Sequence, residues 1–326
     1  MKKKILISST SCLLIADPYI AGLRRRGFEV VVQPQESPRD KVDLFKELLP
    51  GTNALIGGQM PLTEELIGIA GKLQVMSICA SGFNRVNLPL FTRSGVVVTN
   101  VTGPEMVNPV ADHTFGLMLA VARQVPYHDR MLKENRNYRS MGTLVWGKKL
   151  GIIGLGAIGK GVVRRSRGFS MEVLAYDKYI DESFAEKWGV RYVSLEELLK
   201  ESDFLSLHLR LNDETRNILG ERELSMMKPS AYLINAARQF LVDGDALYRV
   251  LSEKRIAGAA LDDRLPREVI TLDNVIATPH IGNLCRESLH EVLETGINNA
   301  IDVLEGKVPS SILNREVYDV LRSKSK

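Results

Sequence analysis

A glycine-rich turn between two short apolar runs constrains the fold of this chain more than any other feature. The first run, Gly151 to Ile153, leads into Gly154-x-Gly156-x-x-Gly159, and the second run ends at the acid Asp177. In such a strand–turn–helix–strand unit the first glycine permits a tight turn, the second lets a pyrophosphate approach the backbone, and the third lets helix and strand pack closely. The free N–H groups that begin the helix favour an anion. The pattern therefore predicts a dinucleotide site on a doubly wound α/β sheet.

The acid after the second run indicates which dinucleotide would bind. Asp177 lies 23 residues after Gly154, where a carboxylate can accept hydrogen bonds from both ribose hydroxyls. The same carboxylate would repel the 2′-phosphate of NADP, so the expected cofactor is NAD. The residues predicted to contact it in this segment are Gly154, Gly156, Ala157, Ile158, Gly159 and Asp177.

Length and composition narrow the class of protein. The 326 residues are too many for one ordinary core and suit two domains. No apolar run is long enough to span a bilayer, and a net charge of +4 from 43 basic and 39 acidic residues indicates a mixed surface without a nucleic-acid footprint. The three cysteines are far apart, which predicts neither a disulfide framework nor a metal site. We therefore expect a cytoplasmic protein with no membrane or nucleic-acid partner.

The chain on both sides of the glycine turn alternates between strand-like and helix-like segments, as parallel α/β domains do. In the first hundred residues, which lack a phosphate-binding fingerprint, the predicted strands are Ile5–Ile7, Val30–Val32, Ala54–Ile56, Val75–Ile78 and Val96–Val98. The predicted helices between them are Tyr19–Arg26, Leu44–Leu49 and Thr63–Ala70. Further strands are predicted at 151–154, 172–176, 204–208, 231–235, 258–261 and 275–278, with helices at 195–199, 244–251 and 288–304.

One long helix, from Asn108 to about Lys133, is predicted between the two alternating regions. Such a helix would connect the domains and offer a surface for a dimer. We expect residues 1–100 and 285–326 to form a substrate domain, and residues 101–284 to form the cofactor domain.

Charged residues follow three predicted strands of the cofactor domain. Arg238 comes after one strand, Asp262 after the next, and His280 after the last. Ligands bind at the carboxyl ends of strands in open α/β sheets. An arginine can grip a carboxylate in a bidentate fork, and a histidine can exchange the proton that accompanies hydride transfer near neutral pH. These residue types at this edge predict an oxidoreductase site for a small acid.

The chain resembles the D-isomer-specific 2-hydroxyacid dehydrogenases over nearly its whole length. Besides the glycine fingerprint, the matching segments are Ser81-Gly82, Asn100, Val110 to His113, Leu205 to Leu209, Asp213 to Arg216, Met227 to Pro229, Asn235 to Arg238, Leu241 to Asp243, Ala257 to Asp262 and Asp273 to Gly282. The resemblance implies two Rossmann-like or flavodoxin-like domains with a cleft between them, joined into a homodimer by the cofactor domains. It also implies NAD-dependent interconversion of a small 2-oxo acid and its D-2-hydroxy acid.

The resemblance also assigns roles to individual residues. Arg238 would bind the substrate carboxylate and the keto oxygen, and His280 would be the general acid/base. The backbone N–H groups near Ser81 and Gly82 would hold the carboxylate from the other domain, and Asp262 would help to place the nicotinamide ring. The further cofactor contacts implied are His208, Arg210, Ala236, Ala237 and His280.

The chain departs from the family at three positions. The family places a glutamate beside the catalytic histidine, where this chain has Arg267; either Glu268 is displaced by one residue and still reaches His280, or the histidine lacks a carboxylate partner. Gln239-Phe240 replaces a glycine pair and would narrow the pocket. Arg210 replaces a proline and would meet the pyrophosphate or a 2′-phosphate.

These departures leave two functions open. The first is an active reductase, and the second is a non-catalytic protein on the same scaffold that senses NAD(H) or binds a partner. The resemblance also bears on the substrate, because phosphoglycerate-specific members carry arginines where this chain has Gly57 to Met60. It therefore favours a small or apolar 2-oxo acid, such as glyoxylate, hydroxypyruvate or a branched analogue.

Overall fold

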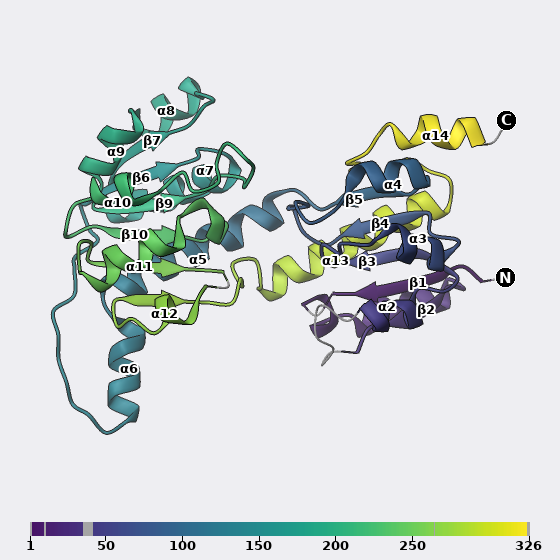
Figure 1. Ribbon diagram of the computed structural model, residues 1–326, viewed down its shortest axis with the longest axis horizontal. Coiled ribbons are helices and arrows are strands. Elements are labelled where there is room, and N and C mark those ends of the chain that lie inside the picture. The colour runs from purple at the N-terminus through teal and green to yellow at the C-terminus, as the bar shows by residue number, and fades with distance from the viewer. Residues whose placement is uncertain (1, 10, 35–41, 264, 325–326) are drawn as a thin grey trace. The chain divides into compact units, whose positions relative to one another are not determined.

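The computed structural model describes residues 2–9, 11–34, 42–263 and 265–324 (Figure 1). The chain divides into two compact units, each considered by itself below. The first unit comprises Met1–Met106 and Leu284–Lys326, and the second comprises Val107–Asn283. The assignment of substrate binding to one unit and cofactor binding to the other remains a prediction.

The first unit is built on a five-stranded parallel sheet with the strand order β2-β1-β3-β4-β5. Its strands are β1 (Lys4–Ser8), β2 (Glu29–Val32), β3 (Thr52–Gly57), β4 (Val75–Ile78) and β5 (Val97–Asn100). Its helices are η1 (Cys12–Leu14), α1 (Asp17–Arg25), α2 (Val42–Leu48), α3 (Glu64–Ala70), α4 (Leu88–Ser94), α13 (Arg286–Leu304) and α14 (Val317–Lys324). Every residue of β3, β4 and β5 is buried, because separate apolar clusters cover the two faces of the sheet.

The long helix α13 brings the end of the chain back onto this sheet (Figure 1). Gly296 allows the close approach, since a Cβ atom there would lie 2.8 Å from Cys79 Sγ. The hydroxyl of Ser77 donates a hydrogen bond to the Gly296 carbonyl at 2.7 Å. Residues from both ends of the sequence therefore share one core.

The second unit is built on a seven-stranded parallel sheet with the order β12-β11-β10-β9-β6-β7-β8. Its strands are β6 (Lys149–Ile153), β7 (Glu172–Tyr176), β8 (Val190–Tyr192), β9 (Phe204–Leu207), β10 (Tyr232–Asn235), β11 (Gly258–Leu261) and β12 (Val275–Ala277). Its helices are α5 (Pro104–Ala122, which begins in the first unit), α6 (Val125–Lys133), α7 (Ala157–Ser166), η2 (Arg167–Phe169), α8 (Glu182–Trp188), α9 (Leu195–Glu201), α10 (Glu221–Ser225), η3 (Gln239–Leu241), α11 (Gly244–Ser252) and α12 (Arg267–Ile270).

The strand order identifies both sheets as doubly wound. The first has the flavodoxin-type order, and the second has the Rossmann order, in which the chain reverses direction between β6 and β9. This confirms the predicted fold class of two parallel α/β domains. Ligands of such sheets bind where the order reverses, beyond the carboxyl ends of the strands.

The prediction of a single helix from Asn108 to Lys133 is wrong. α5 ends at Ala122, and Gln124 adopts a left-handed conformation with φ 53° before α6 begins. Pro126 explains the break, because it has no N–H to donate to the Ala122 carbonyl four residues earlier. That carbonyl accepts the Thr143 N–H instead, at 2.7 Å.

None of the helices that the structure describes is both long enough and apolar enough to span a bilayer.

Candidate active site

The glycine turn follows β6, an interior strand of the second sheet. Gly154 has φ 96°, and a Cβ atom there would lie 2.9 Å from the carbonyl carbon of His208. A Cβ atom on Gly159 would lie 2.3 Å from the Gly154 carbonyl oxygen. Gly156 differs from both, since a Cβ atom there would meet no heavy atom within 4 Å. Packing therefore requires the first and third glycines, whereas the second leaves open space over the backbone.

That open space lies at the start of α7. Gly156 is the N-cap residue of this helix, no side chain caps it, and its first turn contains no acid. The first N–H groups of the helix are therefore available to an anion, and the positive end of the helix dipole favours one. This arrangement fits the pyrophosphate of a dinucleotide.

Asp177, at the end of β7, is hydrogen-bonded to the glycine turn. Its carboxylate accepts the N–H of Leu155 at 2.6 Å and the N–H of Tyr179 at 2.9 Å. A carboxylate offers about four acceptor positions, so two remain for ribose hydroxyls. Asp177 is thus both a scaffold residue and a suitable ribose acceptor.

His208 and Arg210 follow β9, next to β6. The His208 N–H donates to the Ile153 carbonyl at 2.8 Å, and its Nε2 atom lies 2.8 Å from Ser206 Oγ. Burial lowers the pKa of His208 to about 3, so the imidazole is neutral at physiological pH. The side chain of Arg210 is exposed on the same edge of the sheet. Both residues lie where the strand order reverses.

The end of β10 presents Arg238. Asn235 closes the loop around it, because its Oδ1 accepts the Ala237 N–H at 3.0 Å and its Nδ2 donates to the Arg238 carbonyl at 2.9 Å. Arg238 Nη1 donates to the Ala237 carbonyl at 2.7 Å, and Ala236 is buried in the core. Burial lowers the pKa of Arg238, although the guanidinium stays charged. The loop therefore holds a half-buried cation at the strand end.

Asp262 follows β11 and is only 1% exposed. Its carboxylate accepts hydrogen bonds from Thr278 Oγ1 at 2.6 Å, the Ile281 N–H at 2.9 Å and the Gly282 N–H at 2.8 Å. His113 Nε2 lies 3.5 Å from the same carboxylate. Burial alone would raise the pKa of Asp262, but hydrogen bonds from His113, Thr278 and Ile281 outweigh it and lower the pKa to about 2. Asp262 is therefore a buried anion that organises the turn after β12.

That turn carries His280, whose φ of 59° is unusual for a residue other than glycine. Its Nδ1 atom lies 3.1 Å from the Asp262 carbonyl oxygen, and only the imidazole can donate in that pair. Among the residues that the structure describes, Nε2 has no hydrogen-bond partner. The hydrogen bond from Nδ1 to the Asp262 carbonyl thus fixes the orientation of the imidazole, and Nε2 stays available to a ligand.

Glu268 lies in the first turn of α12, and its side chain is exposed. Within the described part of the chain, no hydrogen bond or ion pair joins it to His280. The Glu268–His280 pair therefore remains a prediction, and the described residues show no contact between the two side chains.

Ser81 and Gly82 belong to the first unit, in the loop after β4. The side chain of Asn100 donates to the Ser81 carbonyl at 2.9 Å, and Ser311 Oγ donates to Asn100 Oδ1 at 2.6 Å. These contacts hold the loop by its carbonyl and leave Ser81 exposed. Their role toward a substrate remains a prediction.

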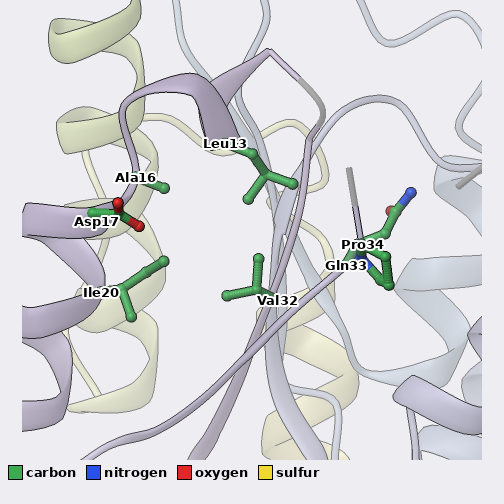
Figure 2. A pocket seen from close by; sticks show the side chains of 7 residues that line it. All are labelled: Leu13, Ala16, Asp17, Ile20, Val32, Gln33 and Pro34. Carbon is green, nitrogen blue, oxygen red and sulfur yellow. The ribbon is translucent and has the colours of Figure 1, made fainter. Parts of the chain in front are cut away.

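A separate hollow of about 310 Å³ lies elsewhere in the first unit (Figure 2). It is lined by Leu13, Ala16, Asp17, Ile20, Val32, Gln33 and Pro34. This lining contains none of the predicted site residues and no basic side chain, so it does not suit an anionic oxo acid.

Sequence reasoning missed the polar residues that hold the predicted ones. Asn235 fixes the Arg238 loop, and Thr278 and His113 complete the shell around Asp262. Asn235 and His113 lie inside the segments that carry the family resemblance, so the polar residues of those segments were the available signal. In the described residues, no group of three or more His, Cys, Asp or Glu side chains could hold a metal ion.

Comparisons with known proteins agree with this geometry. Residues 115–282 match the family described as "D-isomer specific 2-hydroxyacid dehydrogenase, NAD binding domain". A glyoxylate reductase of Korarchaeum cryptofilum is 36% identical over 306 residues, which cover 90% of this chain and 92% of the relative. The TT0316 protein of Thermus thermophilus superposes with a TM-score of 0.85 at 29% identity, covering 95% of this chain and 99% of that one.

A third comparison includes bound ligands. The D-lactate dehydrogenase of Aquifex aeolicus, solved with NAD and lactic acid, has a TM-score of 0.79 at 25% identity and covers 95% of this chain and 99% of its own. The family model and the extent of these similarities decide the family. The chain belongs to the D-isomer-specific 2-hydroxyacid dehydrogenases, NAD-dependent oxidoreductases that interconvert 2-oxo acids and D-2-hydroxy acids.

Proposed function

We propose that this protein is an active NAD-dependent reductase of a small 2-oxo acid such as glyoxylate, hydroxypyruvate or a branched analogue. One observation carries the proposal: the two candidate reacting residues lie at strand ends on either side of β11, and Asp262 links them. The Asp262 N–H donates to the Asn235 carbonyl at 2.9 Å, in the Arg238 loop, and the Asp262 carbonyl accepts from His280 Nδ1 at 3.1 Å.

In this proposal Arg238 binds the substrate carboxylate through its fork of N–H donors and polarises the keto oxygen. The backbone N–H groups of Ser81 and Gly82 bind the carboxylate from the first unit. NAD, when bound, supplies or accepts the hydride exchanged with the substrate. His280 exchanges the proton through Nε2, because its Nδ1 is committed to the Asp262 carbonyl.

Residues of the second unit would hold NAD. The N–H groups beginning α7 at Ala157 and Ile158 would bind the pyrophosphate over Gly156, and Asp177 would accept the ribose hydroxyls. His208, Ala236, Ala237 and Asp262 would border the remaining parts. Repulsion by Asp177 should weaken NADPH relative to NADH by roughly ten- to a hundred-fold, with Arg210 offsetting part of this. Equal dissociation constants for the two cofactors would refute the ribose assignment.

The loop after β3 supports a substrate without a phosphate group. Its residues Gly57 to Met60 include no cation. Gln59 Oε1 accepts the Arg85 N–H at 3.1 Å, and Met60 Sδ lies 3.2 Å from Ser8 Oγ. Residues 57–60 therefore offer no cation of their own to pair with a phosphate dianion.

A homodimer is also part of the proposal. Large apolar side chains are exposed on α6 and the segment after it, a part of the second unit that projects from the sheet in Figure 1. They are Val125, Leu132, Tyr138, Met141, Leu144 and Trp146. A second copy of the chain would cover this surface. Light scattering after size exclusion tests this, since a clean monomer of 36.3 kDa would contradict it.

The compartment and the excluded partners complete the proposal. We expect the protein in the cytoplasm, where its cysteines Cys12, Cys79 and Cys285, all free of disulfides, would stay reduced. A mixed surface charge supports the absence of a nucleic-acid partner.

The decisive experiment is NADH oxidation against a panel of 2-oxo acids, with NADH affinity measured in parallel. Turnover of at least one small 2-oxo acid is expected. Tight NADH binding without turnover of any of them would favour the alternative of a non-catalytic sensor, motivated by the unusual residues Gln239, Phe240 and Arg267.

A further inference from the structure

A second acid, Asp263, directly follows Asp262 at the end of β11. This strand lies between β10 and β12 in the sheet, so its end adjoins both candidate reacting residues. The two carboxylates accept hydrogen bonds from loops on opposite sides of β11. Asp262 accepts the Gly282 N–H in the turn after β12, whereas Asp263 accepts the Gln239 N–H in the loop after β10, at 2.8 Å.

The contact made by Asp263 fixes one particular peptide group, the one between Arg238 and Gln239. Its N–H donates to Asp263 Oδ2, and its carbonyl accepts from Asn235 Nδ2 at 2.9 Å. Both polar atoms of the peptide are therefore held by side chains from adjacent strand ends. Arg238 sits in an extended conformation, φ −142° and ψ 138°, and the two hydrogen bonds hold this backbone geometry, from which its side chain extends.

Charge acts in the same direction as the hydrogen bond. Burial lowers the pKa of Arg238, and the negative charge of Asp263 opposes that effect. A half-buried guanidinium without a nearby anion would pay a larger desolvation penalty or turn toward solvent. Asp263 thus keeps the cation in place before any substrate carboxylate arrives.

We propose that Asp263 is a positioning residue for the reaction, which holds Arg238 in the orientation that receives the carboxylate of a 2-oxo acid. This inference rests on the proposed function, because it requires Arg238 to bind that carboxylate. It predicts that Asp263 acts on substrate affinity and turnover and leaves NADH affinity unchanged.

Three variants of the full-length protein test the role. Asp263→Ala removes the hydrogen bond and the charge, and Asp263→Asn keeps an acceptor for the Gln239 N–H but removes the charge. The matched control is Asp203→Ala at the opposite end of the sheet, because Asp203 likewise accepts a backbone N–H, that of Lys149 at 2.9 Å, and pairs with Lys228 at 2.9 Å. Each variant is checked by thermal unfolding and by NADH titration.

The principal measurement is the Kd of oxamate, an unreactive isostere of a 2-oxo acid, for the NADH-loaded protein, followed by kcat and KM. Asp263→Ala should weaken oxamate about ten- to a hundred-fold, raise KM and lower kcat, since misplacement of a binding group by about 1 Å costs up to about a hundredfold. Asp263→Asn should recover most of the oxamate affinity. Asp203→Ala should lower the thermal stability and leave the oxamate Kd unchanged.

The outcomes separate this inference from the function on which it rests. Wild-type turnover combined with unchanged oxamate affinity in Asp263→Ala overturns the positioning role alone. An equal loss in Asp203→Ala also overturns it, because the effect would then be one of general stability. A wild-type protein that binds NADH but neither binds oxamate nor turns over any 2-oxo acid overturns both.

Discussion

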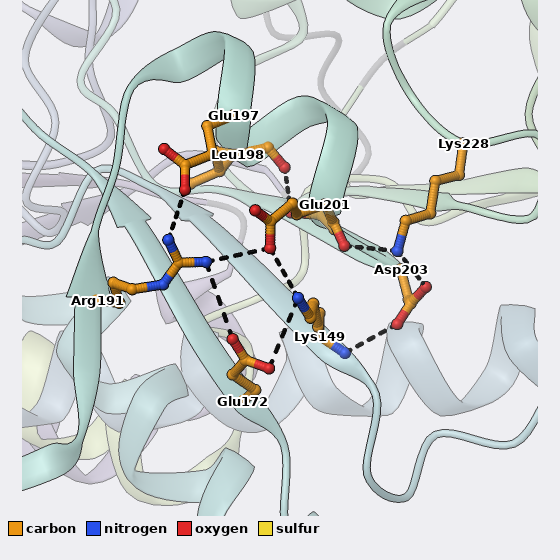
Figure 3. Close-up of polar contacts among 9 residues, drawn as sticks. Lys149, Glu172, Arg191, Glu197, Leu198, Glu201, Asp203 and Lys228 are labelled. Carbon is orange, nitrogen blue, oxygen red and sulfur yellow. Dashed lines mark hydrogen bonds and ion pairs between the residues drawn. The ribbon is translucent and has the colours of Figure 1, made fainter.

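The two ends of the seven-stranded sheet use acidic residues in contrasting ways. At the amino ends of the strands, Arg191 lies among Glu172, Glu197 and Glu201, while Lys149 bonds Glu201 at 2.7 Å (Figure 3). These side chains are all partly exposed, and each charge has an opposite charge beside it. At the carboxyl ends, the Asp262 carboxylate is buried, and its charge is stabilised largely by hydrogen bonds from uncharged donors.

The two ends of the sheet differ in which polar groups remain available to a ligand. In the amino-end network, cations and carboxylates satisfy one another, and Lys228 also donates to the Glu201 carbonyl at 2.6 Å (Figure 3). In the carboxyl-end cluster, the acids bind scaffold atoms, whereas His280 Nε2 has no partner among the described residues. A preorganised site requires that the scaffold groups have their hydrogen bonds satisfied while the reactive atom stays unpaired. We therefore expect mutations at the carboxyl ends to alter activity, with a loss of stability as well where a buried acid such as Asp262 is replaced, and mutations at the amino ends to alter stability only.

The largest effect should follow from removing the imidazole. His280→Ala should lower kcat by about a hundredfold or more, because it removes the proton donor. His280→Asn is the matched control, since asparagine tolerates the left-handed backbone at this position, φ 59°, without supplying a proton. Steady-state kinetics on both variants provides the test. Full activity in His280→Ala would overturn the catalytic assignment and favour a sensor or an unrecognised acid.

Asp262→Asn should mainly destabilise the fold, by about 2 kcal/mol at pH 7. The pKa of Asp262 is lowered from 3.8 to about 2, so its stabilising contribution is complete above pH 3.8 and is lost as the pH falls toward 2. Urea unfolding of both proteins between pH 2 and pH 7 measures it. The difference between wild type and variant should shrink across that window; a difference independent of pH would show that the charge is not its source.

Arg191→Ala should have a smaller effect, although Arg191 contacts three carboxylates. Exposed ion pairs contribute little because water and salt screen them. We expect a small decrease in Tm that disappears near 1 M salt, with kcat/KM unchanged. Calorimetry at low and high salt checks this. A loss of activity would break the proposed division between the two ends of the sheet.

Glu268→Gln should change least. Its side chain is exposed and makes no contact with His280 in the described structure, so the pH profile of reduction should match that of the wild type. Rates measured across the pH range test this directly. A fall in reduction together with a downward shift of its alkaline limit would instead show that Glu268 reaches His280 during the reaction.

The parts of the fold that sequence predicted well are those governed by local pattern. The buried strands read as continuous Val, Ile and Leu runs because both faces of a parallel sheet are covered. The edge strand β8 escaped notice because only Val190 of its three residues is buried. The break between α5 and α6 depended on Pro126, which periodicity alone does not weigh.

The candidate site divides in the same way. Motif spacing located the glycine turn, Asp177 and the charged strand ends, because those positions follow from the order of strands in the chain. It could not show that Asp263 faces the Arg238 loop or that Asp177 also holds Leu155, because side-chain directions beyond a strand end depend on the backbone of the neighbouring loops.

The open space over Gly156 offers a way to uncouple folding from nucleotide recognition. Its φ of −74° suits any residue, and an added methyl group would meet no protein atom within 4 Å. Alanine at this position would therefore intrude on the ligand alone, unlike substitutions at Gly154 or Gly159, which would clash with the protein itself. We expect Gly156→Ala to give a folded protein that does not bind NAD. Comparing the cellular partners of this variant with those of the wild type would show which associations depend on NAD.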